Sequence, residues 1–353
     1  MSRRAPELTG MSVSGLDLTV FFRSLATLQG AGVPLASSFE TLACSVESKA
    51  LAQICELSSR MLAQGHTVSN CFRQFPKAFS AFHVHLIAVG EQTGTLNKVL
   101  LHIATFEESR QRLRQRVQSA LIYPTVVAVL ALLGLVFVLP FVMDGIFEVL
   151  RDSGGDLPLL TQLVMGVSSL MSNPLSWLVI LAVGAGLYRP AKRALTGSRL
   201  RPFLLNLPGL GNCLRSAGAA RFAGALSLCL RSGLNLQRSL ALSALATGDP
   251  LLVERVPGAT KSIEQGSSIS GGLASIEFFS PLFLEIVASG EEVGRTEELL
   301  GWLARTMERD LEQELQTYAS LLEPLMLLAV GLIVGVIVIA TATPMLNLIQ
   351  TLG

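Results

Sequence analysis

The segment AVGEQTGTLNKVL at residues 88–100 contains the short motif GEQTG at residues 90–94. An apolar run precedes this motif, and a run with helical spacing follows it. Such a motif can form a phosphate-binding loop, supply a catalytic carboxylate, or make a tight corner between two helices. A second copy of the motif, GEEVG at residues 290–294, indicates that it belongs to a larger pattern.

The larger pattern is a tandem repeat. Gly290 follows Gly90 by 200 positions, and Gly233 follows Gly32 by 201. The same offset relates FFRSLATLQGAGVPLASSFETLA at 21–43 to RFAGALSLCLRSGLNLQRSLALSALA at 221–246, QGHTVS at 64–69 to QGSSIS at 265–270, and LIYP at 121–124 to LLEP at 321–324. A near-constant offset over separate segments indicates a duplication. The duplicated unit is a helical domain with its following membrane helix.

The composition predicts a membrane protein. Of 353 residues, 50% are hydrophobic and 15% are charged, against about 25% charged residues in an ordinary soluble domain. The formal net charge of +1 offers no basic stripe, so we expect no nucleic-acid partner. The five cysteines form no CxxC pair, which favours small buried residues in a reduced compartment.

Three stretches are long and apolar enough to cross a bilayer, which takes about 20 residues. They are residues 117–143, 170–188 and 320–349. Cations gather before the first stretch and after the second, whereas the loop between them holds only Arg151. The positive-inside rule then predicts a multi-pass membrane protein with a cytoplasmic N-terminus and an extracytoplasmic C-terminus.

Each repeat has the apolar spacing of helices, as at Phe22 and Leu25, and glycines at expected helix ends, as at Gly32, Gly65 and Gly266. The predicted fold is an all-α membrane protein with two homologous cytoplasmic antiparallel helix bundles joined by three transmembrane helices. The expected order is a flexible tail (1–15), the first bundle (16–116), a first span (117–143), a short extracytoplasmic loop with an interfacial helix (144–169), a second span (170–188), a basic cytoplasmic linker (189–215), the second bundle (216–319) and a third span (320–349).

The glycine motif is interpreted as a corner between helices. The chain contains no GxxxxGK[ST] phosphate loop, and the glutamate has no partner acid, base or metal ligand at a recognisable spacing. We expect Gly90 to end a helix with positive φ, Gly94 to turn the chain, and Glu91 to cap the first turn of the following helix, residues 95–116. Because the turn itself does not require glutamate, a partner-docking role stays open. The candidate residues are Gly90, Glu91, Gly94, Gly290, Glu291 and Gly294.

The membrane segments contain further candidates. Gly331 and Gly335 form a GxxxG pattern that permits close helix packing. Pro124 and Pro324 stand at the start of the first and third spans, and Glu323 is expected to cap a helix with Pro324 in its first turn. The four histidines have no spacing typical of a metal site. We expect no catalytic residue, no metal and no cofactor.

With these features the chain resembles the family of type II secretion protein F and type IV pilus protein C. Members of this family are the inner-membrane platform proteins of secretion and pilus machines. The resemblance rests on GEQTG and GEEVG, the corners GAGVPL and SGLNL, the pairs LIYP and LLEP, and LPLLTQL at residues 157–163. It extends from about residue 18 to the end of the chain. Compared with the family pattern, we expect this chain to depart by lacking most of the extended N-terminal region that many members carry, which leaves the subtype open.

The resemblance implies a non-enzymatic platform in the inner membrane. Its expected partners are a cytoplasmic assembly ATPase, pilin or pseudopilin subunits, other inner-membrane assembly proteins, the lipid bilayer and further copies of itself. A small-solute transporter is the alternative, but it would usually have more spans with broken helices. The prepilin peptidase of the same machines would need paired intramembrane aspartates, and no such pair is visible.

Overall fold

The computed structural model describes residues 13–153 and 210–352, and every regular element in these two ranges is an α-helix. The chain divides into two compact units. The first unit comprises Met1–Arg116 and Pro202–Glu312, and the second comprises Val117–Arg201 and Gln313–Gly353. The predicted interfacial helix, the second span and most of the basic linker lie outside the described residues.

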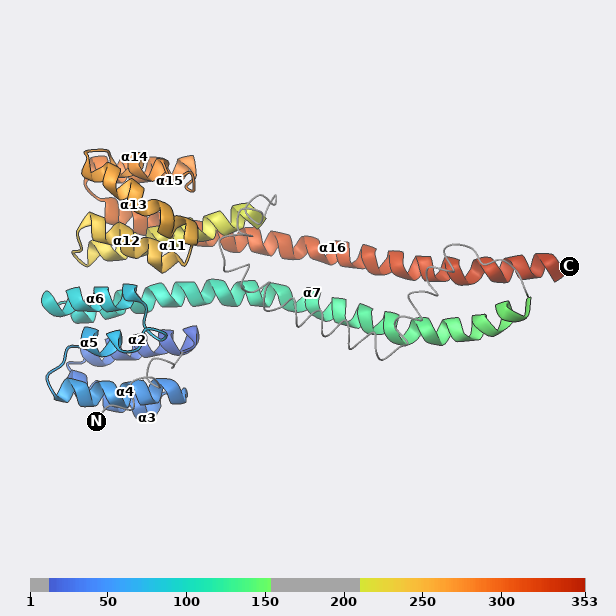
Figure 1. Ribbon diagram of the computed structural model, residues 1–353, viewed down its shortest axis with the longest axis horizontal. Coiled ribbons are helices and arrows are strands. Elements are labelled where there is room, and N and C mark those ends of the chain that lie inside the picture. Colours follow the sequence, from blue (N-terminus) through green and yellow to red (C-terminus); the bar gives the residue numbers. More distant parts are fainter. Residues whose placement is uncertain (1–12, 154–209, 353) are drawn as a thin grey trace. The chain divides into compact units, whose positions relative to one another are not determined.

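The first bundle is built from short helices that pack on their neighbours along the chain (Figure 1). Its elements are α2 (Gly15–Gly30), α3 (Leu35–Ser45), α4 (Lys49–Ala63), α5 (Val68–Arg73), α6 (Ala81–Gln92) and the start of α7 (Leu96–Ser153). Gly32 and Gly65 have φ values of 77° and 87° at the corners after α2 and α4. Only glycine adopts this conformation at no steric cost, so these two predicted helix ends are confirmed.

The second bundle repeats the same order of elements. It consists of α11 (Leu210–Arg231), α12 (Leu236–Thr247), α13 (Pro250–Glu264), α14 (Ile269–Ala274), α15 (Pro281–Val293) and the start of α16 (Thr296–Leu352). The tandem repeat is therefore confirmed at the level of elements. The described part of α11 starts at Leu210, within the predicted linker of residues 189–215. The repeat offset changes from 201 to 200 in the turn before α15, where Glu277 has a φ of 56°.

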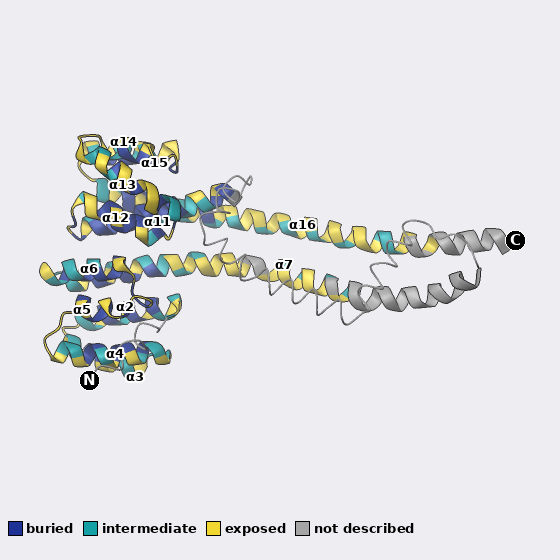
Figure 2. Ribbon diagram, viewed as in Figure 1, coloured by how far each residue is buried: buried dark blue, intermediate teal, exposed yellow. Residues whose placement is uncertain are grey.

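Aromatic side chains form much of each core, where buried residues gather (Figure 2). In the first bundle the rings of Phe72 and Phe79 stack with centroids 3.7 Å apart. In the second bundle Phe279 and Phe283 stack with centroids 4.4 Å apart. Large buried rings contribute more hydrophobic area per residue than any aliphatic side chain. They allow helices of only 6 to 16 residues to hold together.

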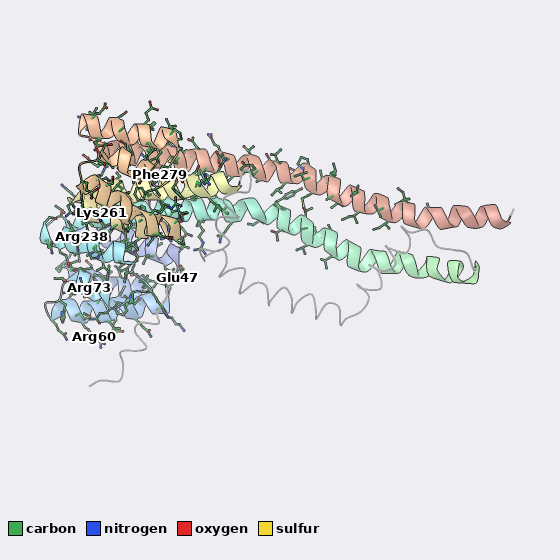
Figure 3. All side chains as sticks on the ribbon, turned by 45° about the horizontal axis from the view of Figure 1, so that its top comes forward. Glu47, Arg60, Arg73, Arg238, Lys261 and Phe279 are labelled. Atoms are coloured by element: carbon green, nitrogen blue, oxygen red, sulfur yellow. The ribbon has the colours of Figure 1, made fainter. Side chains whose placement is uncertain are left out.

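The two bundles share one apolar interface within the first unit. Leu228, Leu234 and Leu242 of the second bundle belong to the same buried cluster as the core of the first. At its edge Arg238 on α12 donates a hydrogen bond to His85 Nδ1 on α6 at 3.2 Å. Arg238 is one of the side chains labelled in Figure 3. Burial, and next the charge of Arg238, lower the pKa of His85, so that its ring is neutral and can accept this bond.

Helices α7 and α16 each run from the first unit into the second without a break. Pro124 lies inside α7 and Pro324 inside α16. The expectation that Glu323 caps a new helix with Pro324 in its first turn is therefore wrong, since the helix is already formed before both residues. One helical segment in the described ranges, Thr296–Ile339, is long and apolar enough to cross a membrane, and its most apolar part is unburied within this chain.

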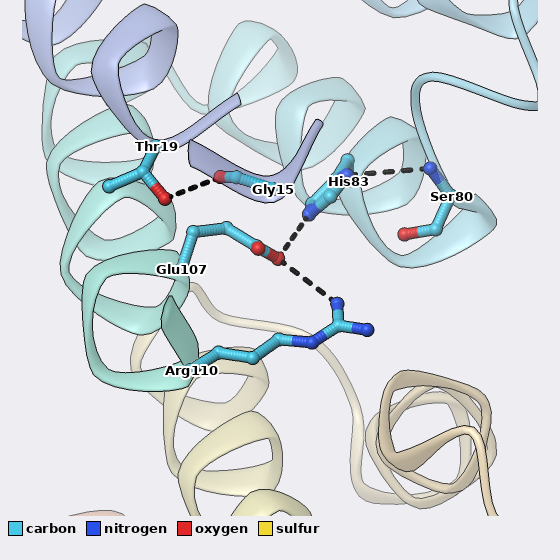
Figure 4. A network of polar contacts seen from close by, with 6 residues as sticks. All are labelled: Gly15, Thr19, Ser80, His83, Glu107 and Arg110. Atoms are coloured by element: carbon cyan, nitrogen blue, oxygen red, sulfur yellow. Dashed lines mark hydrogen bonds and ion pairs between the residues drawn. The ribbon is translucent and has the colours of Figure 1, made fainter. Parts of the chain in front are cut away.

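A buried polar pair joins α6 to α7 in the first bundle (Figure 4). His83 Nε2 lies 3.1 Å from Glu107 Oε1, and both side chains are at most 4% exposed. The backbone N–H of Ser80 donates to His83 Nδ1 at 3.4 Å, which places the ring proton on Nε2, facing the carboxylate. Arg110 approaches the same carboxylate oxygen at 3.6 Å. The pair thus adds a second link between the two helices that the GEQTG corner connects.

Burial alone would raise the pKa of Glu107, but the hydrogen bond from His83 and the charge of Arg110 outweigh it and lower that pKa. The second bundle has Phe283 and Met307 at the corresponding positions, both packed in its apolar core. The first bundle therefore joins its two helices here through a hydrogen-bonded carboxylate, and the second bundle joins them through apolar packing.

This divergence predicts the outcome of a double substitution. Glu107→Met should destabilise the protein by about 1–3 kcal/mol, because His83 then buries an unpaired donor. Adding His83→Phe should recover most of that loss, since it recreates the packing of the second bundle. Thermal unfolding of the full chain in detergent measures both. A double variant as unstable as Glu107→Met would contradict this account.

The same pair predicts an acid dependence. Because the folded-state pKa of Glu107 is lowered, its contribution is complete above the ordinary value of 4.5 and is lost as the pH falls through the lower folded value. The double variant should lack this part of the acid destabilisation.

Candidate functional site

The first glycine motif closes the end of α6. The helix ends at Gln92, and Gly94 then adopts a left-handed conformation with φ of 68°. The N–H of Thr95 donates to the carbonyl of Gly90 at 2.9 Å, a bond that spans the whole motif. This arrangement pairs carbonyls that the helix end would otherwise leave without partners. It turns the chain directly into α7.

The second motif makes the same corner between α15 and α16. Gly294 also has φ of 68°, and the N–H of Arg295 donates to the carbonyl of Gly290 at 2.9 Å. The two corners therefore agree in backbone conformation although only the glycines and the first glutamate are common to both sequences.

The first glycine of each motif serves close packing. The expectation of positive φ at Gly90 is wrong, because Gly90 lies inside α6 and only Gly94 of this motif has positive φ. A Cβ atom at Gly90 would lie 3.1 Å from the Cα of Leu96 and 3.0 Å from a methyl carbon of Val99. At Gly290 it would lie 3.1 Å from the Cα of Thr296. These contacts are tighter than ordinary packing. The absence of a side chain at each glycine therefore allows the two helices to approach each other closely.

The carboxylate of Glu91 caps α5, a helix that lies 23 positions earlier in the chain. One oxygen accepts the N–H of Val68, and the other accepts the N–H of Ser69 at 3.3 Å together with the Ser69 hydroxyl. The Thr67 hydroxyl accepts the N–H of Asn70 at 3.2 Å. The exposed N–H groups of this first turn are thereby satisfied, and a negative charge lies at the positive end of the helix dipole.

Glu291 caps α14 in the same way but with fewer bonds. Both of its oxygens accept the single N–H of Ile269, at 3.0 and 2.9 Å. The Ser268 hydroxyl accepts the N–H of Gly271 at 3.0 Å. The hydroxyl of Ser270, the counterpart of Ser69, lies 3.1 Å from that of Ser268 instead of reaching the glutamate.

Capping was expected, but at the wrong helix. We expected Glu91 to cap the helix that follows the motif, whereas both glutamates cap the short helix two elements before that helix. A signal for this contact is present in the sequence, because a Ser or Thr typical of an N-cap precedes each glutamate by a similar distance, at Thr67 and Ser268. The contact links α5 to the α6–α7 corner, and α14 to the α15–α16 corner.

The corners carry no visible reactive group. Burial, and next the nearby charge of Glu91, raise the pKa of Cys71 to about 11. Burial likewise raises the pKa of Cys55 and of Cys229 to about 12. These thiols are therefore protonated at neutral pH and are poor nucleophiles. Within the two described ranges no three His, Cys, Asp or Glu residues are grouped so as to hold a metal ion.

The membrane-segment candidates lie on the surface of the chain. A Cβ atom at Gly331 or Gly335 would meet nothing within 4 Å, so no other described part of this chain covers that face of α16. Sequence reasoning missed the buried contact between His83 and Glu107, because the histidine spacing was judged for metal binding alone.

The corner geometry predicts opposite responses at the two glycines of the first motif. Gly94→Asn should cost less than Gly94→Ala, because asparagine tolerates the left-handed conformation better. Gly90→Asn should cost more than Gly90→Ala, because space limits this position; the alanine itself should cost about 1–3 kcal/mol. Denaturant unfolding of the full chain in detergent gives both rankings. The same ranking at both positions would contradict the assignment of one glycine to conformation and the other to packing.

Comparison with known families agrees with the repeat. The family model described as "Type II secretion system (T2SS), protein F" matches residues 21–143 and again residues 222–344. The two matches have the offset of 201 found in the sequence (222 minus 21). They cover most of the chain, including the corners at both glycine motifs.

Several curated relatives match over nearly the whole chain. Type II secretion system protein F of Pseudomonas aeruginosa is 33% identical, over 97% of this chain and 85% of the relative. Type IV pilus assembly protein PilC of Thermus thermophilus is 33% identical, over 96% of this chain and 84% of the relative. TapC, a type IV pilus assembly protein of Aeromonas hydrophila, is 29% identical, over 98% of this chain and 84% of the relative.

These matches confirm the resemblance seen in the sequence. The chain belongs to the family of type II secretion system protein F, with one copy of the family domain in each of its two repeats.

Proposed function

We propose that this chain is the inner-membrane platform protein of a type II secretion or type IV pilus machine. In this role it couples a cytoplasmic assembly ATPase to the insertion of pilin-like subunits into a filament. The observation that carries the proposal is the double family match, at the same offset as the repeat. The relatives named for secretion and for pilus assembly are equally identical, at 33%, so both kinds of machine are consistent with this chain.

The role is that of a coupling protein without its own energy source. The sequence has no GxxxxGK[ST] loop for a nucleoside triphosphate. The energy would therefore come from a partner ATPase. Two continuous helices, α7 and α16, each begin at a glycine corner and extend into the apolar part of the chain. A movement at either corner would be carried along one rigid element.

Membrane insertion is supported by exposed apolar residues. Along α16, Leu325, Leu328 and Leu332 are 61–69% exposed within the chain. Along α7, Ile122 and Leu130 are 62% and 61% exposed. Such continuous apolar surface needs a lipid or helix partner. We assign it to bilayer contact, and we assign the uncovered glycine face of α16, at Gly331 and Gly335, to contact with another copy.

The proposed topology is tested by reporter fusions. Reporters placed near Gly15 and Arg255 should be cytoplasmic, and those placed near Gly154 and after Gly353 should be extracytoplasmic, because the flanking cations retain the bundles inside. An alkaline phosphatase and a fluorescent protein fusion at each site give complementary signals. An extracytoplasmic signal at Arg255 would exclude the three-span arrangement.

The function and the role of the glutamates are tested together by co-purification. The wild-type chain should retain the assembly ATPase encoded beside its gene. We expect Glu91→Gln to destabilise the chain by about 1–2 kcal/mol, because it loses charged hydrogen bonds to Ser69. Glu291→Gln should cost less, about 0.3–1 kcal/mol, since one amide oxygen still serves Ile269. The double variant should keep the ATPase below its unfolding temperature.

The matched control replaces the exposed neighbours, as Gln92→Ala with Glu292→Ala. A folded double glutamine variant that loses the ATPase, while this control keeps it, would show that the glutamates dock the partner. Loss of the ATPase by the wild-type chain as well would count against the platform role itself.

A further inference from the structure

A cavity of about 490 Å³ opens between α7, α11 and α16 within the first unit. Its apolar wall includes Phe106, Gly224 and Ala304, where the three helices approach one another. A Cβ atom at Gly224 would lie 3.6 Å from the Cβ of Ala304 and 3.7 Å from the ring of Phe106. These are ordinary packing distances, so the three helices lie close together at this level of the cavity.

The polar wall of this cavity is rich in arginine. Five arginines line it, against two glutamates, Glu308 and Glu312. The arginines are Arg112 and Arg116 on α7, Arg231 on α11, and Arg305 and Arg309 on α16. Each of the three helices therefore contributes at least one guanidinium group, and the formal balance is five positive charges against two negative ones.

Among the described residues, Arg116 is the one arginine of this cavity that forms an ion pair. Carboxylates lie near three of the others: Glu308 acts on Arg112 and Arg305, and Glu297 and Glu298 line a neighbouring hollow with Arg231 and Arg305. Arg112 donates to the hydroxyl of Ser109 at 3.1 Å, and Arg116 is 4.0 Å from Glu312. Arg231, Arg305 and Arg309 form no ion pair within 4.0 Å with the residues that the structure describes. Burial raises the pKa of Glu308, although the charges of Arg112 and Arg305 and a hydrogen bond from Ser109 oppose this.

The arginines that the second repeat contributes to the cavity have no arginine counterparts in the first repeat. The positions of Arg305 and Arg309 correspond to Thr105 and Ser109 in the first repeat, and that of Arg231 corresponds to Gly30. The arginines are thus specific to the place where the two bundles meet. Arg116 supports the packing of the bundles through its ion pair with Glu312, whereas the remaining cations repel one another across the interface.

We propose that this cavity binds a phosphate group, carried either by the headgroup of an anionic phospholipid or by a soluble phosphate compound. Guanidinium groups form paired hydrogen bonds that match phosphate oxygens, and such charge-assisted bonds are stronger beside an apolar wall. The cavity volume lies in the range of about 300–1,000 Å³ typical of small-ligand sites. It accommodates a headgroup, whereas a folded peptide segment would need a longer surface.

Along α7, the cavity lies close to the start of the predicted membrane span, so a lipid headgroup could reach it. Arg116 directly precedes Val117, where the apolar stretch begins. Arg112 lies five residues before Val117, which is about 7.5 Å along the helix axis at about 1.5 Å per residue. The headgroup layer on each side of the hydrocarbon is itself about 5–7 Å thick. A bound phosphate would connect both bundles, because its ligands come from α7 of the first and from α11 and α16 of the second.

The neighbouring hollow supplies a spectroscopic probe. Trp302 lines it together with His102, Arg231 and Arg305, and the last three residues also line the cavity. The chain has two tryptophans, so Trp177→Phe leaves Trp302 as the single emitter. The full chain with this substitution is placed in phosphatidylcholine nanodiscs and titrated with pyrophosphate. In parallel, nanodiscs are prepared with increasing fractions of phosphatidylglycerol.

A matched pair of variants distinguishes binding in the cavity from general electrostatic attraction to the protein surface. The cavity variant is Arg305→Gln with Arg309→Gln. The control is Arg114→Gln with Arg215→Gln, which removes the same charge from exposed positions outside the cavity. The cavity variant should bind about tenfold more weakly per arginine removed, and the control should bind nearly as the parent does.

The outcomes decide both the site and its ligand. A response to phosphatidylglycerol alone, weakened in the cavity variant, identifies a lipid headgroup site; a response to pyrophosphate alone identifies a soluble ligand; a response to both supports the shared phosphate chemistry. Equal weakening in the cavity variant and the control would overturn the proposal, as would no response to either titrant. Loss of a protein partner by the cavity variant without any phosphate response would also overturn it, in favour of a docking surface for an acidic segment.

Discussion

The carboxylate that caps α5 in one repeat and α14 in the other ties the short helix of each bundle to its glycine corner. Both capped helices have six residues, too few to be stable alone in water. Glu91 and Glu291 satisfy the first N–H groups of these helices and lie one residue after the glycine that packs against the next helix. A single turn of α6 or α15 therefore joins three elements. Changes in this turn would alter the direction of the long helix and the position of the short one together.

The two repeats have diverged around a common interface. Leu228 and Leu242 of the second bundle pack against the first, whereas their counterparts in the first bundle are the exposed Thr27 and Thr41. Phe82 of the first bundle is 1% exposed, but its counterpart Leu282 is 64% exposed. At these positions a residue is buried in one bundle, whereas its counterpart in the other bundle is exposed. A duplicated domain can in this way form a defined pair in place of an open array.

This arrangement suits a protein that transmits force between a soluble partner and a membrane. The corners that start α7 and α16 lie in the bundles, and the same two helices continue into the apolar segments. The polar pair of His83 and Glu107 fixes one of these helices to its bundle, and hydrocarbon fixes the other. The cationic cavity lies between the two helices on the bundle side. An anion bound there would stabilise one arrangement of the bundles over others.

The sequence by itself determined the duplication, the helical class, the glycine-terminated corners and the family. These features depend on local backbone preferences and on residue order, as at Gly32, Gly94 and the matching Gly294. The helix that Glu91 caps, the close packing at Gly90, the buried pair of His83 with Glu107 and the arginines around the cavity were decided by the tertiary structure. Each of these joins residues from different helices. Periodicity along the chain places a residue on one face of its own helix, but it does not tell which other helix covers that face.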